Sequence, residues 1–408
     1  RKKELNEENR LNLHDFDKTI VIGLGFVGLT LAVHIAKSGY PVIGVDSNLE
    51  VVKNLNNKHS PFYEQGLESA LDEMDSNALF FNDDIPSLNK SKRNIFVIAV
   101  GTPIKNGRTD FEQLKSSIKL VNRHINDDDL LVIRSTVPIG TCKDFVPKFI
   151  DNDKQIHICM APERTAEGVA LSELQNLPQI IGANDKESYE IAEKYFTNFC
   201  SSIVNVGSTS AAEICKLVCN GYRDLNFGFS NELSLLCEEL NIDAFDLVSN
   251  CNIGYERMTM PLPSPGVGGY CLTKDPLLYA NSGATISNLF TGKLSKYARK
   301  SNIEAGLTPD RALINFINEV YQDKNKTLKI LVCGVAFKGT PETDDVRFST
   351  SMEFVDRMVK NKHDIYITDA SEMTLKKFTS NYKIFNFLDK VDDDFDAIFV
   401  LNNNPKNL

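Results

Sequence analysis

Three glycines between an apolar segment and a helical one constrain this fold more than any other feature. Residues 19–22 (Thr-Ile-Val-Ile) are typical of a buried strand, and Gly23, Gly25 and Gly28 follow as the start of a helix. The next apolar strand ends in Asp46. A strand, a glycine turn, a helix and a second strand within roughly 30 residues form one βαβ unit.

Each glycine has a separate task if this unit binds a dinucleotide. The first allows a tight turn, the second lets a pyrophosphate approach the backbone, and the third lets the helix pack on the strand. The carboxylate of Asp46 can accept hydrogen bonds from a ribose 2′-hydroxyl, and Ser47 and Asn48 follow it without an arginine for a 2′-phosphate. The pattern favours NAD over NADP; a glycine-rich helix start without a ligand is the weaker alternative. The expected contacts in this unit are Gly23, Gly25, Phe26, Val27, Gly28 and Asp46.

The rest of the chain repeats the alternation of short apolar strands and helical stretches, which is typical of a parallel, doubly wound sheet. Between 208 and about 240, apolar residues recur at helical spacing without proline, so we expect one long helix that links domains or forms a subunit interface. The βαβ pattern restarts at 328. We therefore predict the α/β class, with two Rossmann-like doubly wound domains joined by a long central helix. The expected divisions are a frayed N-terminus at 1–15, an NAD-binding domain at 16–207, a central helical dimerisation domain with a loop around Cys271 at 208–325 and a second Rossmann-like domain at 326–408.

Composition excludes several functional classes. The formal net charge of −10 over 408 residues argues against nucleic-acid binding and against a polybasic membrane surface. Nine scattered cysteines without a CxxC pair, and only six histidines, make a structural zinc site improbable, so we expect no metal. With no signal peptide or membrane-spanning run in the sequence, we expect a reduced, cytoplasmic protein.

A second glycine motif carries a cysteine. Gly268 and Gly269 precede Cys271, and Lys274 and Asp275 follow it. A lone cysteine behind a turn is more often a packed core thiol than a reactive one. In a chain that also binds a hydride acceptor, the same thiol indicates an oxidation that passes through a covalent thioester.

Three further motifs each allow a purely structural interpretation and a functional one. Ser135 and Thr136 lie just after a strand, where α/β proteins bind ligands or simply turn. Glu163 and Glu167 would share one face if their segment were helical. In the long helix, Lys216 and Asn220 are four residues apart; the lysine either extends to the helix surface or takes part in proton transfer.

Taken together, these motifs resemble the UDP-glucose/GDP-mannose dehydrogenase family, the nucleotide-sugar 6-dehydrogenases, from about Lys18 to the C-terminus. The order and spacing of the motifs carry the resemblance. The matching motifs are the glycine turn, Val100-Gly101-Thr102-Pro103, Ser135-Thr136-Val137-Pro138, Pro162-Glu163, Lys216 and Asn220 with Asn231-Glu232-Leu233, the Gly268–Asp275 motif, and Phe337-Lys338 with Asp345-x-Arg347.

The resemblance implies an enzyme that oxidises the C6 alcohol of a nucleotide sugar to a carboxylate with two NAD. Cys271 would be the nucleophile, Lys216 and Asn220 would stabilise the C6 oxygen, and Glu163 would act as base or orient water. The other implied catalytic residues are Thr136, which would help Glu163, and Asp275. The implied cofactor contacts beyond the glycine turn are Thr102, Ser135, Glu167 and Arg347. The implied substrate contacts are Arg164, Lys216, Gly268, Gly269, Phe337, Lys338 and, across a dimer, Arg257. The implied role of the C-terminal domain is to bind the nucleotide diphosphate.

Arg164 and Thr165 after Glu163 make the chain more similar to the members that oxidise UDP-N-acetylhexosamines than to those that oxidise UDP-glucose. We therefore expect a UDP-N-acetylhexosamine 6-dehydrogenase of polysaccharide biosynthesis that acts as a homodimer. UDP-glucose 6-dehydrogenase is the first alternative, and a non-catalytic sensor of NAD or nucleotide sugar is the second. The β-hydroxyacid dehydrogenases share the N-terminal fold and a helical lysine, but need neither the cysteine motif nor a second Rossmann-like half.

Overall fold

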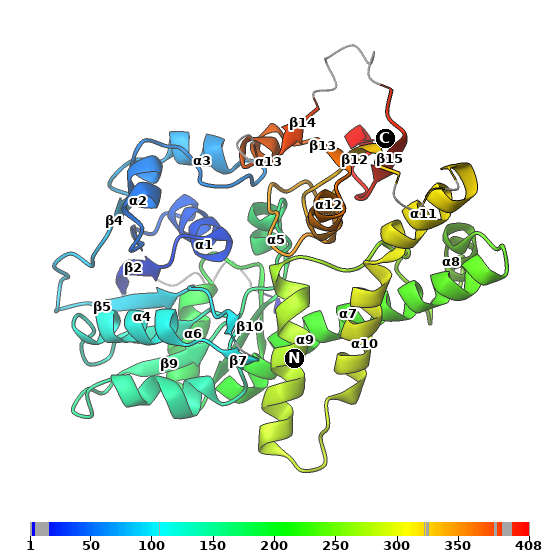
Figure 1. Cartoon of the computed structure of the whole chain (residues 1–408). Coiled ribbons are helices and arrows are strands. Elements are labelled where there is room, and N and C mark those ends of the chain that lie inside the picture. Colours follow the sequence, from blue (N-terminus) through cyan, green and yellow to red (C-terminus); the bar gives the residue numbers. More distant parts are fainter. Residues whose placement is uncertain are drawn as a thin grey trace. The chain divides into compact units, whose positions relative to one another are not determined.

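The computed structural model describes residues 2–4, 16–105, 107–321, 323, 326–378, 382–385 and 394–407. The chain divides into two compact units, 1–217 and 218–408, and each is described by itself. Figure 1 shows the elements of both units and their order along the chain.

The first unit is built on a nine-stranded sheet with the order β1-β11-β10-β9-β8-β5-β2-β3-β4. All neighbours from β4 through β9 run parallel, as the sequence predicts, whereas β10 is antiparallel to β9. The strands are β1 (Lys2–Glu4), β2 (Phe16–Ile22), β3 (Val42–Val45), β4 (Leu79–Asn82), β5 (Arg93–Ile98), β8 (Leu130–Ile133), β9 (His157–Met160), β10 (Gln179–Ala183) and β11 (Ser202–Asn205), with a separate hairpin of β6 (Ile104–Lys105) and β7 (Arg108–Thr109).

Helices cover both faces of this sheet (Figure 1). Along β2, Val21 packs into the cluster that includes α1, α3 and α6, while Ile20 and Ile22 pack into the cluster that includes α4. Because both faces are covered, the central strands are continuous apolar runs instead of alternating ones. The helices of this unit are α1 (Phe26–Lys37), α2 (Leu49–Asn56), α3 (Leu67–Glu73), α4 (Glu112–Asn122), α5 (Ala170–Asn176) and α6 (Lys186–Phe196).

The position of β2 in the sheet creates the place for a ligand. From β2 the chain passes through α1 to β3 on one side, and β5 lies on the other side of β2. The strand order therefore reverses beside β2. Open α/β sheets bind ligands in the crevice outside the carboxyl ends of the strands at such a point, and the glycine turn lies at that end of β2.

The long helix expected between 208 and 240 is confirmed as α7 (Thr209–Glu239), which spans the boundary between the two units. The second unit adds α8 (Ala244–Asn252), α9 (Tyr270–Ile286), α10 (Lys293–Ala305) and α11 (Thr308–Phe316). Single turns of other helix types lie at Thr141–Phe145, Val146–Phe149, Ile317–Tyr321 and Pro405–Asn407.

The second unit also contains an all-parallel sheet, whose strand order is β14-β13-β12-β15. Its elements are β12 (Lys329–Cys333), α12 (Thr350–Lys360), β13 (Asp364–Thr368), α13 (Glu372–Lys376), β14 (Lys383–Ile384) and β15 (Ala397–Val400). Two Rossmann-like sheets and a long central helix confirm the predicted fold class.

Two expectations need correction. Lys2–Glu4 form an edge strand antiparallel to β11, because the unpaired backbone groups of an edge strand accept another strand, so a frayed end is wrong for these residues. Residues 1 and 5–15 of that expected segment lie outside the described part of the chain. The segment around Cys271 is also not a loop, because Tyr270 begins α9 directly after Gly269. Within the described residues, no helix is both long and apolar enough to cross a membrane.

Candidate active site

The glycine turn after β2 is closely packed on two sides and open on the third. Gly23 has φ +91°, and a Cβ there would lie 2.9 Å from the carbonyl oxygen of Ala99 after β5. A Cβ on Gly28 would lie 1.8 Å from the carbonyl oxygen of Gly23, so α1 can begin this close to the turn only with glycine. A Cβ on Gly25 would meet nothing within 4 Å. The open side is where a ligand can approach the backbone.

Asp46 closes the turn from the end of β3. Its Oδ2 accepts a hydrogen bond from the backbone N–H of Leu24 at 2.8 Å, and its Oδ1 accepts one from the N–H of Asn48 at 2.9 Å. Each carboxylate oxygen can accept a second hydrogen bond, so the side chain is fixed and still able to bind ribose hydroxyls. The N-cap of α1 is Gly25 and its first turn holds no acidic residue. No acidic side chain of that turn opposes the positive end of the helix, so these residues fit a dinucleotide and would hold its phosphates there.

Two substitutions separate packing from ligand approach. Gly28→Ala should lower both the melting temperature and NAD affinity, because its methyl group overlaps the carbonyl of Gly23. Gly25→Ala should leave the melting temperature within a few degrees and weaken NAD binding roughly tenfold or more, because its methyl group occupies space that the pyrophosphate needs. Differential scanning fluorimetry and NAD titration measure both; equal NAD affinity in Gly25→Ala and the parent would contradict the assignment.

The loops after β5 and β8 are joined at the same edge of the sheet. Thr102 donates its hydroxyl proton to the carbonyl oxygen of Thr136 at 2.5 Å, and Ser135 donates to the carbonyl oxygen of Val100 at 2.8 Å. Both hydroxyls are engaged with backbone, so the hydrogen bonds brace the two loops against each other. These hydrogen bonds bring the loop of the expected cofactor residue Thr102 together with the loop of Ser135 and Thr136. Ser135 is also an expected cofactor residue, and Thr136 is an expected catalytic residue.

Glu163 is held by a residue that the sequence analysis missed. Arg134, at the carboxyl end of β8, is fully buried and forms a short ion pair with Glu163. The guanidinium also donates to the carbonyl oxygen of Ala161 and the side-chain oxygen of Gln179, both at 3.0 Å. Burial on its own raises the pKa of Glu163, but the Arg134 charge and the backbone N–H groups of Thr165 and Arg164 outweigh it, so the pKa is lowered. The carboxyl group is therefore ionised and oriented.

The segment that follows Glu163 is irregular, so Glu163 and Glu167 do not share a helical face. Glu64 fixes this segment by accepting hydrogen bonds from the N–H groups of Gly168 and Ala170 at 2.7 and 2.6 Å. Glu167 is half-buried within it. Arg164 donates to the carbonyl oxygen of Pro178, which anchors its guanidinium inside the first unit.

The second unit gathers the charged residues of the cysteine motif around Asn220 of α7. Asn220 donates from Nδ2 to Oδ2 of Asp275 at 2.6 Å, and Nζ of Lys274 lies 3.6 Å from Oδ1 of the same carboxylate. Asn220, Lys274 and Asp275 are all buried. Lys216 lies one turn earlier on α7 and is also buried, so an extended surface lysine is excluded.

Cys271 is exposed and lies in the first turn of α9. Two glycines let this helix start pack against the C-terminal domain of the same unit. A Cβ on Gly268 would lie 2.3 Å from the carbonyl oxygen of Phe348, and one on Gly269 would lie 2.6 Å from the ring of Phe337. The N–H of Gly269 donates to that Phe348 carbonyl at 3.1 Å. The glycine that begins the cysteine helix and the expected substrate residue Phe337 are therefore in close contact.

Cations surround the ring of Tyr270. Nζ of Lys274 lies 5.0 Å from the ring centroid and Cζ of Arg347 lies 4.7 Å from it. Asp345 holds Arg347 in place: Nε donates to Oδ1 and Oδ2 of Asp345 at 2.9 and 3.0 Å, and Nη2 donates to Oδ2 at 2.7 Å. Lys338 lies over the ring of Phe337 at 5.5 Å. The expected cofactor residue Arg347 and the expected substrate residue Lys338 therefore each lie over an aromatic ring at or beside the cysteine motif, Tyr270 and Phe337 respectively.

One expected residue stands apart from this group. Arg257 is exposed, and its guanidinium lies over the ring of Tyr255 at 5.2 Å in the segment between α8 and α9. Glu163, Thr136 and Lys216 belong to the first unit, and Cys271, Asn220 and Asp275 belong to the second. Each half of the expected catalytic set is thus ordered inside its own unit.

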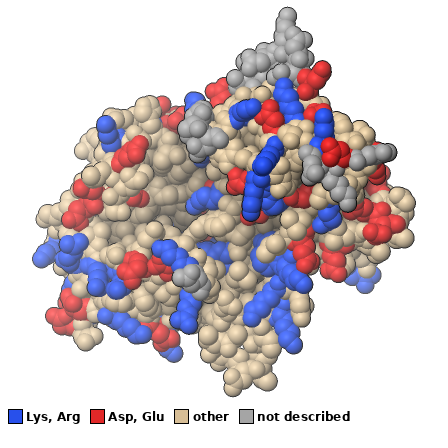
Figure 2. All heavy atoms as spheres, in the orientation of Figure 1, with Lys and Arg blue, Asp and Glu red and all other residues tan. Residues whose placement is uncertain are grey.

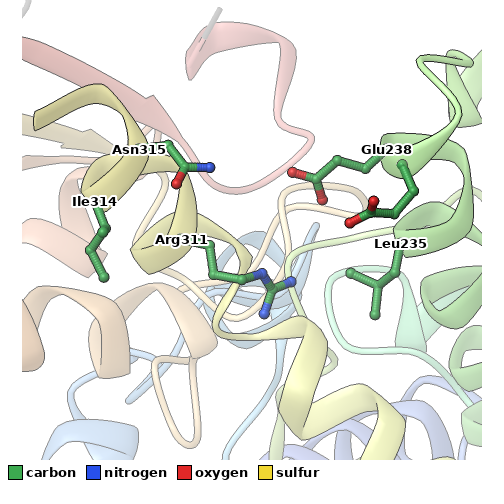
Figure 3. A pocket seen from close by; sticks show the side chains of 6 residues that line it. Leu235, Glu238, Arg311, Ile314 and Asn315 are labelled. Carbon is green, nitrogen blue, oxygen red and sulfur yellow. The ribbon is translucent and has the colours of Figure 1, made fainter. Parts of the chain in front are cut away.

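A surface pocket of about 440 Å³ lies elsewhere in the second unit, between the end of α7 and α11. Figure 3 shows Arg311 extending from α11 toward the side of α7 that carries Leu235 and Glu238. None of the expected site residues lines this pocket. Among the described residues, no cluster of three or more His, Cys, Asp or Glu side chains is arranged to hold a metal ion. Figure 2 shows Lys and Arg side chains as well as Asp and Glu side chains on the face drawn.

The comparisons with known proteins agree with this geometry. Residues 17–200 match the NAD binding domain of the UDP-glucose/GDP-mannose dehydrogenase family, and residues 210–303 match the central domain of that family. The chain belongs to this family. The resemblance drawn from the motifs is therefore confirmed, and the chain is an NAD-dependent nucleotide-sugar dehydrogenase.

Individual relatives cover nearly the whole chain. The UDP-N-acetyl-D-mannosamine dehydrogenase of Pyrococcus horikoshii is 28% identical over an alignment of 399 residues that covers 95% of this chain and 89% of the relative. An NDP-N-acetyl-D-galactosaminuronic acid dehydrogenase of Ralstonia nicotianae is 28% identical over 85% of this chain and 81% of the relative. The solved structure of the UDP-D-ManNAc dehydrogenase from Pyrococcus horikoshii has a TM-score of 0.82 at 27% identity and covers 95% of this chain and 90% of that one.

Proposed function

We propose that the protein oxidises the C6 hydroxyl of a UDP-N-acetylhexosamine to the carboxylate in two NAD-dependent steps, through a thioester on Cys271. The observation that carries this proposal is the exposed thiol in the first turn of α9, beside the buried group of Asn220, Lys274 and Asp275. A thiolate is a better nucleophile and a better leaving group than an alkoxide, which suits an oxidation that passes through an acyl intermediate.

The steps balance as follows. NAD supplies the hydride acceptor for both oxidations. After the C6 alcohol has become an aldehyde, the sulfur of Cys271 adds to C6, a C–S bond forms and the aldehyde oxygen takes up a proton. Loss of hydride and a proton from this thiohemiacetal gives the thioester. Water then attacks the carbonyl carbon and the C–S bond breaks. The acid leaves, and the sulfur of Cys271 takes up a proton and is again a thiol.

Lys216 and Asn220 are proposed to stabilise the negative charge that develops on the C6 oxygen. Both are buried and lie one turn apart on α7. Asp275 accepts a hydrogen bond from Asn220, which fixes the amide for this role. The proposed cofactor contacts remain the glycine turn, Asp46, Thr102, Ser135, Glu167 and Arg347. The proposed substrate contacts remain Arg164, Lys216, Arg257, Gly268, Gly269, Phe337 and Lys338.

Glu163 is proposed to orient the hydrolytic water, with Thr136, and not to serve as a general base. A general base works best when its pKa lies near the working pH, whereas Arg134 and two backbone N–H groups lower the pKa of Glu163. A carboxylate that stays ionised can hold a water molecule in place by accepting its hydrogen bond. The sequence is compatible with both roles, and the ion pair favours this one.

A substrate panel tests the proposal. Purified protein with NAD should form NADH with at least one of UDP-N-acetylmannosamine, UDP-N-acetylglucosamine and UDP-N-acetylgalactosamine, at a higher kcat/KM than with UDP-glucose. The names of the relatives and the Arg164-Thr165 sequence support this preference for UDP-N-acetylhexosamines over UDP-glucose. Preference for UDP-glucose would replace the proposal with its first alternative. Binding of NAD and UDP-sugar without NADH formation would favour the sensor.

We also propose that the protein acts as a homodimer through α7. Tyr222, Phe229 and Leu236 are spaced seven residues apart, and their exposed fractions are 67%, 64% and 56%. Residues at this spacing lie on one helix face, and an aligned apolar row is costly to leave in water. Phe229→Glu should therefore shift the mass measured by light scattering from dimer to monomer. The exposed Glu232 on the same helix offers a control, Glu232→Gln, which should leave the mass unchanged; a monomeric parent protein would contradict the proposal.

A further inference from the structure

A buried arginine contacts the backbone on both sides of Cys271. Arg299 of α10 is 4% exposed. Its Nη1 donates to the carbonyl oxygen of Leu272 at 2.8 Å, and its Nη2 donates to the carbonyl oxygen of Val267 at 2.9 Å. Between these two carbonyls lie only Gly268, Gly269, Tyr270 and Cys271. One planar guanidinium thus fixes the length and direction of the segment that presents the thiol.

Pro276 explains why the Leu272 carbonyl needs this partner. In an α-helix the carbonyl of one residue accepts from the N–H four positions later, and proline has no N–H. Pro276 lies inside α9, four residues after Leu272. The first turn of α9 therefore has a carbonyl that its own helix cannot satisfy, and Arg299 supplies the donor.

Arg299 is itself held in place by α7. Its Nη1 lies 2.8 Å from Oδ1 of Asp224, which is fully buried. Asn302 donates to the backbone carbonyl and to Oδ1 of Asp224 at 2.9 and 2.8 Å. Asn231 donates to Asn302 at 2.8 Å and accepts from the N–H of Ser264 at 2.8 Å. A buried chain of hydrogen bonds therefore runs from α7 through α10 to the segment before Cys271.

The arrangement gives α7 two adjacent contacts with the start of α9. Asn220 reaches α9 directly through Asp275. Asp224, one turn later, reaches it through Arg299. Burial raises the pKa of Asp224, and only Arg299 and Asn302 oppose that rise. Replacing a buried ion pair by apolar residues is often neutral for stability, so the pair's contribution to stability is a poor account of its presence.

We propose that Arg299 is a positioning residue for Cys271, which sets the sulfur where it can capture the C6 aldehyde. The proposal rests on the proposed function in one respect, the role of Cys271 as nucleophile. Arg299 touches neither substrate nor cofactor in this account. It acts on the second oxidation, which needs the sulfur, and not on the first, which removes hydride from the alcohol.

Arg299→Lys is the primary variant, because an ammonium keeps the positive charge beside Asp224 but cannot contact both carbonyls in the planar geometry of a guanidinium. The expected result is a kcat for acid formation that falls roughly 10- to 100-fold, with the KM for UDP-sugar changed less than about threefold. The number of NADH formed per sugar should fall from two toward one, and hydroxylamine should trap an aldehyde. A purely structural role would lower both oxidations together and leave the ratio at two.

Two further variants keep the test decisive. The double change Arg299→Met with Asp224→Asn removes both buried charges, so no carboxylate is left unpaired, and it should show the same split. Lys300→Met is the matched control: Lys300 is the next residue on α10, is exposed, and pairs only with Glu304 among the ion pairs of the described chain. A ratio of two NADH per sugar in folded Arg299→Lys would overturn the proposal, as would failure of both Arg299 variants to fold, since that would make the role structural.

A readout without turnover separates this proposal from the proposed function. Iodoacetamide alkylation of Cys271, measured by mass spectrometry relative to the exposed Cys251, should change at least about threefold in Arg299→Lys and not in Lys300→Met. A changed ratio in a protein that oxidises no UDP-sugar would sink the proposed function and keep the positioning role. An unchanged ratio, with the wild type active, would remove the positioning role alone.

Discussion

Cys271→Ser should abolish steady-state formation of the uronic acid, with a fall in kcat of roughly 10³-fold or more. Serine keeps the shape of the side chain but its hydroxyl is a far weaker nucleophile than a thiolate, and an ester formed on it releases its acyl group more slowly than a thioester. Binding of NAD and of UDP-sugar should persist, because neither the glycine turn nor the C-terminal domain is altered. A coupled assay for NADH and chromatography of the sugar products measure the effect.

The chain offers a matched control for this variant. Cys251 is the other cysteine of the described chain that is exposed, and it lies on α8, away from the motif. Cys251→Ser should keep kcat within about twofold of the parent value, as expected of a surface substitution. Turnover of Cys271→Ser at the rate of the Cys251→Ser control would exclude the covalent mechanism.

The second large effect is on stability, at Arg134. Arg134→Met should lower the free energy of unfolding by about 3–5 kcal/mol, because it leaves the carboxylate of Glu163 buried without its partner. It also removes the donors to Ala161 and Gln179. Urea unfolding measures the loss. The double variant Arg134→Met with Glu163→Gln is the control, and it should recover a substantial part of the stability because no buried charge remains.

Arg134→Met should also reverse the sign of the contribution that Glu163 makes to the pH dependence of stability. In the parent protein the pKa of Glu163 is lowered, so its contribution is present above the unfolded pKa and is lost as pH falls through the folded value. Without Arg134, burial dominates and the folded pKa lies above the unfolded one. Arg134→Met should then gain stability relative to the parent when the pH is lowered from about 7 to about 5. A constant difference between the two proteins over this range would contradict the role given to the ion pair.

The glycine turns were predictable because their constraints are local. Gly23, Gly25 and Gly28 need only the strand before them and the helix after them. The structure has both, because β2 ends at Ile22 as expected and α1 begins at Phe26. The long helix expected between 208 and 240 is found for the same reason, since helical periodicity is read within one segment.

The partners of the site residues were not predictable, because they are set by contacts between distant segments. Arg134 follows an apolar strand in the sequence, and its partner Glu163 lies 29 positions away across a sheet edge. The signal was present, because an arginine at the end of a fully apolar strand must find a counter-charge when it is buried. Arg299 gave a weaker signal, since its contacts with Leu272 and Asp224 depend on how α7, α9 and α10 pack.

The segment around Cys271 is a helix and not the expected loop for a physical reason. Two glycines and Pro276 within nine residues are typical of a loop. The structure keeps a helix there because the glycines allow close packing against Phe337 and Phe348, while Arg299 satisfies the carbonyl that Pro276 leaves without a helical donor. Cys271 therefore lies on a helix whose start is fixed from two directions.

The number of NADH formed for each UDP-sugar consumed tests the central claim most directly. The reaction is run to completion with limiting UDP-N-acetylhexosamine and excess NAD, and the product is identified by mass spectrometry. The covalent two-step account predicts two NADH for each sugar and a product that is the uronic acid. One NADH for each sugar, with the aldehyde as the product, would contradict it.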